Sequence, residues 1–140
     1  MPSRFWLLKS EPFKWSWDQQ VAAGEAGTVW DGVRNHSAKL NLKSMRLGDR
    51  AFFYHSNEGL AAVGVVEVVR EAFPDPTAEP GSPWLSVQVA AREALPNPVT
   101  LAAIRAEPAL ARMSLVTSAR LSVQPVTAEE WAVVCRMGGL

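Results

Sequence analysis

The chain is poor in the residues that form covalent cross-links and metal centres. Among its 140 residues there is a single cysteine, Cys135, so neither an intramolecular disulfide nor a thiolate metal cluster is available. The two histidines, His36 and His55, do not form a His-x-x-x-His motif, which argues against a zinc site. Neither a Walker A pattern nor a Gly-x-Gly-x-x-Gly pattern occurs. We therefore expect no metal and no cofactor.

The sequence also lacks an excess of charge and a long apolar run. Lys and Arg together number 14, as do Asp and Glu, so the formal net charge is zero. A protein that coats nucleic acid non-specifically needs positive charge to neutralise phosphates, which excludes that class but leaves room for a local basic patch. No segment approaches the roughly 20 apolar residues of a membrane span, and the first residues lack the apolar core of a signal peptide. We expect a soluble, cytoplasmic protein without a membrane partner.

The patterning predicts one α+β domain over residues 1–140, built from short strands and small helices. We expect strands at 5–8, 51–55, 60–69, 85–89 and 121–126. We expect helices at about 16–24, 35–45, 100–106 and from Thr127 onward. Four prolines predict a surface loop at 73–83. The spacing of strands and turn signals favours a mostly antiparallel, barrel-like sheet with small peripheral helices.

Tryptophan is unusually abundant, with six in this short chain. One of them begins the segment Trp30-Asp31-Gly32-Val33-Arg34-Asn35, which fits neither a buried strand nor an ordinary loop. Together these residues supply a flat aromatic surface, a glycine, a guanidinium group and an amide. These groups can hold a planar, hydrogen-bonding, phosphate-linked ligand, which describes a nucleobase.

Five segments together resemble the EVE domain family of the PUA-like superfamily. They are Lys9-Ser10-Glu11-Pro12, Trp30 to Asn35, Phe53-Tyr54-His55-Ser56-Asn57, Pro98-Val99-Thr100-Leu101 and Arg120 to Val126. Each motif is weak alone, but their order along the chain makes the match specific. The resemblance runs from Phe5 to about Met137.

This resemblance implies a PUA-like β-barrel with a pocket on one side, related in architecture to YTH and SRA domains. It also implies binding of a modified base in DNA or RNA, without catalysis. The motifs and the chemistry of their side chains predict these ligand-binding residues: Lys9, Ser10, Glu11, Trp30, Val33, Arg34, Asn35, Tyr54, His55, Ser56, Arg120, Ser122 and Gln124.

Several of these residues have an alternative structural role. Trp30 is expected to be an aromatic platform on which a base stacks, although it could instead be a core residue. Tyr54 could line the pocket or fill the core, and Asn35 could read a base edge or cap the following helix. Arg34 fits a phosphate or base-edge contact, because arginine is seldom buried unpaired.

Small polar residues on the predicted strands are also ambiguous. Ser10, Ser122 and Gln124 alternate with apolar neighbours, so they either face a polar cavity or face solvent.

A basic stripe is expected directly after the predicted pocket segment. On a continuous helix, Lys39, Lys43 and Arg46 would share one face at i, i+4 and i+7, where they could contact phosphates or form an ordinary solvated surface.

Two other functions remain open. Lys9, Glu11 and His55 could form a general acid–base site if they converge, as in a small amidohydrolase acting on a modified nucleoside. A protein-interaction module would instead show an exposed apolar patch. The sequence does not distinguish 5-methylcytosine, 5-hydroxymethylcytosine, N6-methyladenine or another base, nor DNA from RNA.

Overall fold

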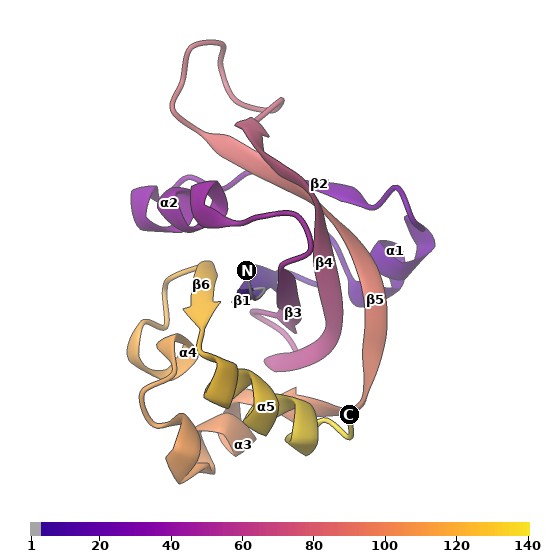
Figure 1. Ribbon diagram of the computed structural model, residues 1–140, viewed down its shortest axis with the longest axis vertical. Helices are drawn as coiled ribbons and strands as arrows, with labels where there is room; N and C mark the ends of the chain where they lie inside the picture. The colour runs from indigo at the N-terminus through magenta and orange to yellow at the C-terminus, as the bar shows by residue number, and fades with distance from the viewer. Residues whose placement is uncertain (1–3) are drawn as a thin grey trace.

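The computed structural model describes residues 4–140, which form one six-stranded sheet surrounded by small helices (Figure 1). The strands lie in the order β2-β5-β4-β3-β1-β6. Their bounds are β1 (Phe5–Ser10), β2 (Thr28–Trp30), β3 (Arg50–His55), β4 (Ala61–Pro74), β5 (Leu85–Thr100) and β6 (Val123–Val126). The helices are α1 (Trp17–Ala22), α2 (His36–Ser44), α3 (Leu101–Ala106), η1 (Pro108–Leu110), α4 (Ser114–Thr117) and α5 (Ala128–Met137).

The predicted mostly antiparallel α+β fold is confirmed, but the sheet is not closed. β1 and β3 are parallel, and the other pairings between neighbouring strands are antiparallel. Within residues 4–140 no pairing joins the edge strands β2 and β6. Helix α2 instead contacts β4, β5 and β6, and Asn41 Nδ2 donates a hydrogen bond of 2.7 Å to the Val123 carbonyl. The helix thus occupies a position where a closed barrel would have strand pairing.

Strands β1 and β3 are buried on both faces, which explains their nearly continuous apolar sequences. Trp6 and Phe53 point into a core shared with α2, whereas Leu7, Phe52 and Tyr54 point into a second core. The period-2 alternation of side chains along a strand produces this division. Helices α3, α4 and α5 gather around the second core at one end of the sheet, and the loop between β4 and β5 extends from the other end (Figure 1).

The predicted helix starts follow the capping chemistry of the sequence. Ser16 with Gln19 and Thr127 with Glu130 form reciprocal capping boxes at the starts of α1 and α5. Asn35 and Thr100 cap α2 and α3 through their side-chain oxygens. The residues at these boundaries were therefore sufficient to place four helices.

The sequence prediction missed β2 and α4 and underestimated the lengths of β4 and β5. The register between β4 and β5 shifts at four places, so neither strand keeps a regular alternation over its whole length. Strand β2 has only three residues, too few for a periodic signal.

Gly64, on β4, allows α1 to pack closely against the sheet. A Cβ atom at this position would lie 2.3–2.5 Å from the indole ring of Trp17. That ring meets Phe53 edge to face at a centroid distance of 5.4 Å. The missing side chain at position 64 therefore makes room for a tryptophan at the start of α1.

We expect Gly64→Ala to lower the free energy of unfolding by roughly 1–3 kcal/mol, the usual cost of overpacking. Urea denaturation measures this loss. The same change should cost less in a Trp17→Leu background, because the smaller side chain leaves room for the added methyl group. Equal losses in both backgrounds would contradict the proposed clash.

Candidate functional site

A cavity of about 700 Å³ opens beside the C-terminal end of β1. This volume lies within the usual range for small-molecule sites. Its walls come from the end of β1 and the following turn, from β2 and the segment after it, and from residues next to β3 and β6. They are Lys9, Ser10, Glu11, Lys14, Trp15, Thr28, Val29, Trp30, Asp31, Gly32, Val33, Arg34, Ser56 and Ser122.

The parallel pairing of β1 and β3 brings these distant segments together. Ser10 is the register partner of His55, so the C-terminal ends of both strands meet. The Ser56 amide donates to the Ser10 carbonyl at 2.9 Å, and the Lys9 amide donates to the Ser122 carbonyl at 3.0 Å. These backbone bonds fix Ser56 and Ser122 on either side of β1.

Two tryptophans, Trp15 and Trp30, contribute aromatic surface to the cavity. Trp30 is only 8% exposed and packs edge to face on Phe53, with the ring centroids 5.6 Å apart. It is therefore mainly a core residue with a small part of its surface at the cavity. Trp15 is less buried, and its Nε1–H donates to Gln20 Oε1 at 2.8 Å.

Gln20 holds the orientation of the Trp15 ring from within the protein. Its side chain is fully buried, and Nε2 donates to the Val89 carbonyl at 3.1 Å. The Ser10 hydroxyl also donates to the Trp15 carbonyl. Both the ring and the backbone of Trp15 are thus fixed before any ligand binds.

Lys9 places a half-buried ammonium group in the cavity wall. Its Nζ donates to the Ala119 carbonyl at 2.5 Å. Burial lowers the pKa of Lys9 from its ordinary value, because the charged form loses hydration. Nearby, Glu11 and Lys14 form an exposed ion pair at 3.8 Å.

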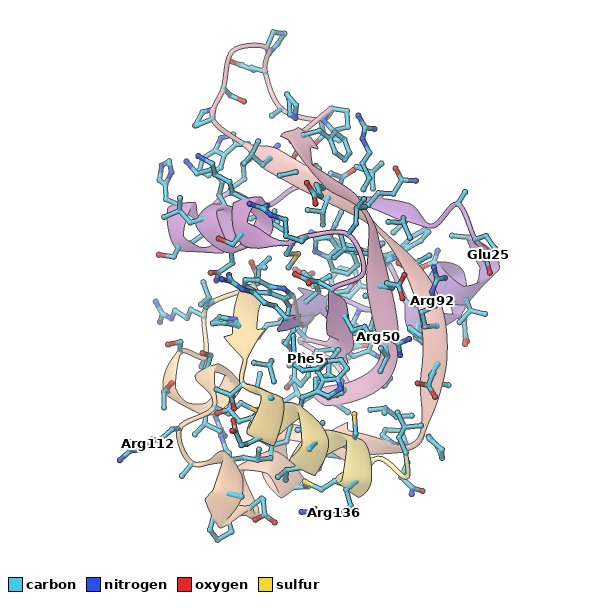
Figure 2. All side chains as sticks on the ribbon, in the orientation of Figure 1. Phe5, Glu25, Arg50, Arg92, Arg112 and Arg136 are labelled. Atoms are coloured by element: carbon cyan, nitrogen blue, oxygen red, sulfur yellow. The ribbon has the colours of Figure 1, made fainter. Side chains whose placement is uncertain are left out.

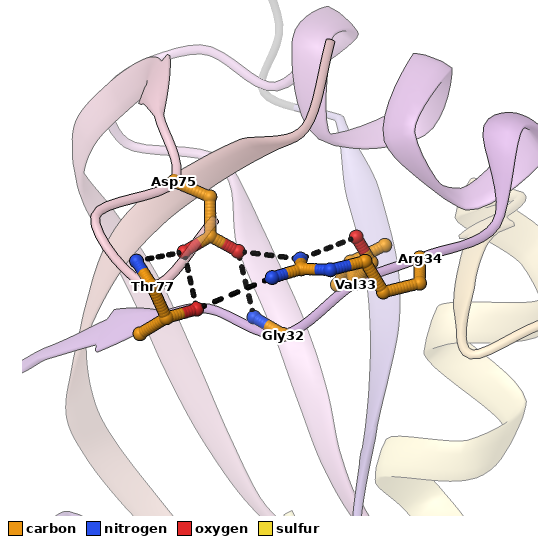
Figure 3. A network of polar contacts seen from close by, with 5 residues as sticks. All are labelled: Gly32, Val33, Arg34, Asp75 and Thr77. Carbon is orange, nitrogen blue, oxygen red and sulfur yellow. Dashed lines mark hydrogen bonds and ion pairs between the residues drawn. The ribbon is translucent and has the colours of Figure 1, made fainter. Parts of the chain in front are cut away.

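The wall formed by Gly32, Val33 and Arg34 is attached to the rest of the protein by one buried carboxylate, Asp75 (Figure 3). Arg34 Nη1 and the Gly32 amide each donate to Asp75 Oδ2 at 2.8 Å. Thr77 donates to Oδ1 through its amide and its hydroxyl, both at 2.7 Å. Gly32 has φ of +78°, a backbone conformation that favours glycine.

These bonds determine the protonation of Asp75. Burial alone would raise the pKa of the carboxyl group, but the hydrogen bonds from Arg34, Thr77 and Gly32 outweigh it and lower the pKa to about 2. Asp75 is therefore ionised at neutral pH and holds the Arg34 guanidinium, which also lies 5.8 Å from the centroid of Trp84.

Eight of the thirteen predicted ligand-binding residues line the cavity. They are Lys9, Ser10, Glu11, Trp30, Val33, Arg34, Ser56 and Ser122. Their contact with a ligand remains a prediction, but the structure brings them to one place. The Arg34 guanidinium is already paired with Asp75, and its contact with a phosphate or a base edge remains a prediction.

The other five predicted residues lie outside the cavity lining, and four of them make structural interactions instead. The Asn35 side chain caps α2, Tyr54 is buried in the second core, and His55 Nε2 accepts the Trp17 amide at 3.2 Å. Gln124 is fully buried, and its Nε2 donates to the carbonyls of Ser118 and Leu121. Arg120 is exposed.

The expected basic stripe is only partly helical. Helix α2 ends at Ser44, so Arg46 lies beyond it and cannot occupy the i+7 position of the same helix. The Arg46 guanidinium instead donates to the carbonyls of Lys43 and Met45. Lys39 and Lys43 remain four residues apart on α2.

The sequence prediction missed Trp15, Lys14 and Asp75. Trp15 and Lys14 follow the Lys9–Pro12 motif closely, so their nearness to a predicted wall was an available signal. Asp75 lies 41 residues from Arg34 within the proline-rich loop, and nothing in the sequence connects the two.

The family model described as "EVE domain" matches residues 4–137. The chain belongs to the EVE domain family. It is 36% identical to human thymocyte nuclear protein 1 over 165 aligned residues, covering 94% of this chain and 72% of that protein.

Solved structures agree with this assignment. A protein from Agrobacterium tumefaciens is 56% identical, with a TM-score of 0.97 and coverage of 99% of this chain and 94% of that one. Human THYN1 protein in complex with DNA containing 5-methylcytosine is 32% identical, with a TM-score of 0.88 and 99% of each chain covered. A YTH domain from Zygosaccharomyces rouxii shares the fold, with a TM-score of 0.58 at 19% identity, 99% of this chain and 88% of that one being covered.

Within residues 4–140, none of the helices is long and apolar enough to cross a membrane. The same residues contain no group of three or more His, Cys, Asp or Glu side chains suited to hold a metal ion.

We expect Asp75→Asn to lower the free energy of unfolding at neutral pH by roughly 2 kcal/mol, the value of a pKa shift from 3.8 to about 2. Because the folded-state pKa is lowered, the stabilisation is fully present above about pH 4 and is lost as the pH falls toward about 2. Urea denaturation between pH 2 and pH 7 measures both effects.

Glu79→Gln is the matched control, since Glu79 is an exposed carboxylate in the same loop. It should leave stability almost unchanged. If Asp75→Asn keeps the acid dependence of the wild-type protein, the assigned role of Asp75 is wrong.

Proposed function

We propose that this EVE domain binds one modified base of DNA or RNA in the cavity beside β1, without catalysis. The observation that carries the proposal is the composition of that cavity. Aromatic surface from Trp15 and Trp30 lies beside the polar groups of Lys9, Ser56 and Ser122. Aromatic faces stack on bases, and a small number of polar groups can read a base edge.

The relatives support the same ligand class. Human THYN1 protein, similar over 99% of this chain, was solved with DNA containing 5-methylcytosine. This favours 5-methylcytosine as the first base to test. Asp75 and Gln20 hold the cavity walls in place before a ligand binds. This also suits a binding module, because a rigid site loses less conformational entropy when a ligand enters.

The amidohydrolase alternative has less support from the geometry. Its acid–base group would need Lys9, Glu11 and His55 to converge on one substrate. Lys9 and Glu11 line the cavity, but the His55 ring lies outside the lining and accepts the Trp17 amide. Incubation with a modified nucleoside and chromatography of the products tests turnover directly, and turnover lost on Lys9→Met would favour the enzyme.

Trp15 is the better candidate for the stacking platform, because it is less buried than Trp30. We expect Trp15→Ala to weaken binding of a single-stranded oligonucleotide with one 5-methylcytosine by roughly 5- to 150-fold, since stacking contributes about 1–3 kcal/mol per base. Fluorescence anisotropy measures the affinities for modified and unmodified strands.

Trp15→Phe is the matched control, since it keeps an aromatic face while losing the bond to Gln20. It should retain most of the affinity. Wild-type affinity in Trp15→Ala would refute the platform assignment, and equal wild-type affinity for modified and unmodified strands would refute the proposed base preference. Trp30→Ala should abolish the preference for the modified base, but the burial of Trp30 in the core requires a parallel stability measurement.

Helix α2 begins immediately after the cavity wall and offers a path for the phosphate backbone. Arg34 lines the cavity, Asn35 caps the helix, and Lys39 and Lys43 follow one turn apart. Arg50, the next basic residue after Arg46, is paired with Glu67 and Glu93 on the sheet. We therefore assign phosphate contacts to Lys39 and Lys43.

We expect the double change Lys39→Gln, Lys43→Gln to reduce the slope of log affinity against log salt concentration by roughly 1.5, the value for two phosphate contacts. The ratio of affinities for modified and unmodified strands should stay constant. Arg112→Gln with Arg136→Gln is the control, because these arginines lie at the other end of the molecule (Figure 2). An equal change of slope in both double variants would contradict the assignment.

A further inference from the structure

We infer that the turn formed by Glu11–Lys14 is a wedge that enters a duplex beside the extruded base, with Phe13 as the inserting side chain. This inference rests on the proposed function and extends it from the base in the cavity to the duplex outside. It assigns a double-stranded nucleic acid as the partner of Phe13, a side chain that does not line the cavity.

The position of Phe13 follows from its neighbours. The amides of Lys14 and Trp15 both donate to the Glu11 carbonyl at 2.9 Å, which closes a tight turn. Glu11, Lys14 and Trp15 line the cavity, whereas Phe13 does not belong to the lining. Phe13 therefore lies at the tip of a turn whose two ends form part of the cavity mouth.

Phe13 is exposed in an unusual way for an aromatic residue. It is 65% exposed, the largest fraction among the exposed large apolar residues of the part described. The turn that carries it is rigid, because Pro12 restricts the backbone and the Ser10 hydroxyl donates to the Trp15 carbonyl. The chain thus presents an apolar ring to solvent from a backbone that is held in place.

Extrusion of a base from the duplex into the cavity would leave a gap in the base stack next to the cavity mouth, where Phe13 lies. Proteins that open base steps often fill the gap with an apolar side chain, which recovers part of the lost stacking. Lys14, beside Phe13 and 71% exposed at its side chain, can pair with the adjacent phosphate. A single strand has no such gap, so Phe13 should matter only for duplex substrates.

The test compares the affinities of the wild-type protein and Phe13→Ala for a DNA duplex with one 5-methylcytosine and for the same modified strand alone. We expect Phe13→Ala to weaken duplex binding about 10-fold, or about 1.4 kcal/mol, and to leave single-strand binding unchanged. Phe13→Trp should restore duplex binding. Val21→Ala is the control, because Val21 is an exposed apolar residue of α1 outside the cavity lining.

The outcomes separate the inference from the proposed function. Equal effects of Phe13→Ala on duplex and single strand, or no effect on either, would overturn the wedge while leaving the base-binding proposal intact. A wild-type protein that shows no preference for the modified single strand would overturn the proposed function, and the wedge with it. Thermal denaturation of Phe13→Ala should match the wild-type curve, since the side chain is largely exposed.

Discussion

The buried carboxylate of Asp75 is the interaction on which the candidate site depends. It joins the loop after β4 to the segment after β2, through Gly32 and Arg34 (Figure 3). Without a partner, a buried carboxylate would be strongly unfavourable, and Arg34, Gly32 and Thr77 together supply the donors that compensate its burial. The cavity wall from Gly32 to Arg34 is therefore positioned by a contact outside the cavity. The one arginine of the segment therefore has a structural role in holding this wall.

The remaining walls are consequences of strand topology. Parallel pairing of β1 and β3 places Ser10 next to His55, and the antiparallel partner β6 brings Ser122 to the same edge. Gln20 then fixes Trp15 from the core side. A cavity with aromatic and polar walls thus arises where strand ends meet, and its geometry is set before a ligand is present. Such preorganisation lowers the entropic cost of binding.

Much of the fold was predictable because local chemistry determined it. The capping boxes at Ser16 and Thr127 and the cap at Asn35 located helix starts, and the apolar runs located most of the strands. The cavity was predictable in part, since eight predicted residues meet there. Tyr54 and Gln124 were not, because the face of the sheet on which a side chain lies depends on tertiary packing. Asp75 was also inaccessible to sequence reasoning, since its partnership with Arg34 spans 41 residues and carries no local pattern.

The central claim, that the cavity beside β1 receives a single modified base, is tested most directly by nuclear magnetic resonance. The indole N–H groups of the six tryptophans provide reporters spread through the chain. On titration with a short single-stranded DNA containing one 5-methylcytosine, the Trp15 and Trp30 signals should shift. The signal of Trp131, which packs against the second core, should stay unchanged. Shifts at Trp131 with none at Trp15 and Trp30 would contradict the account.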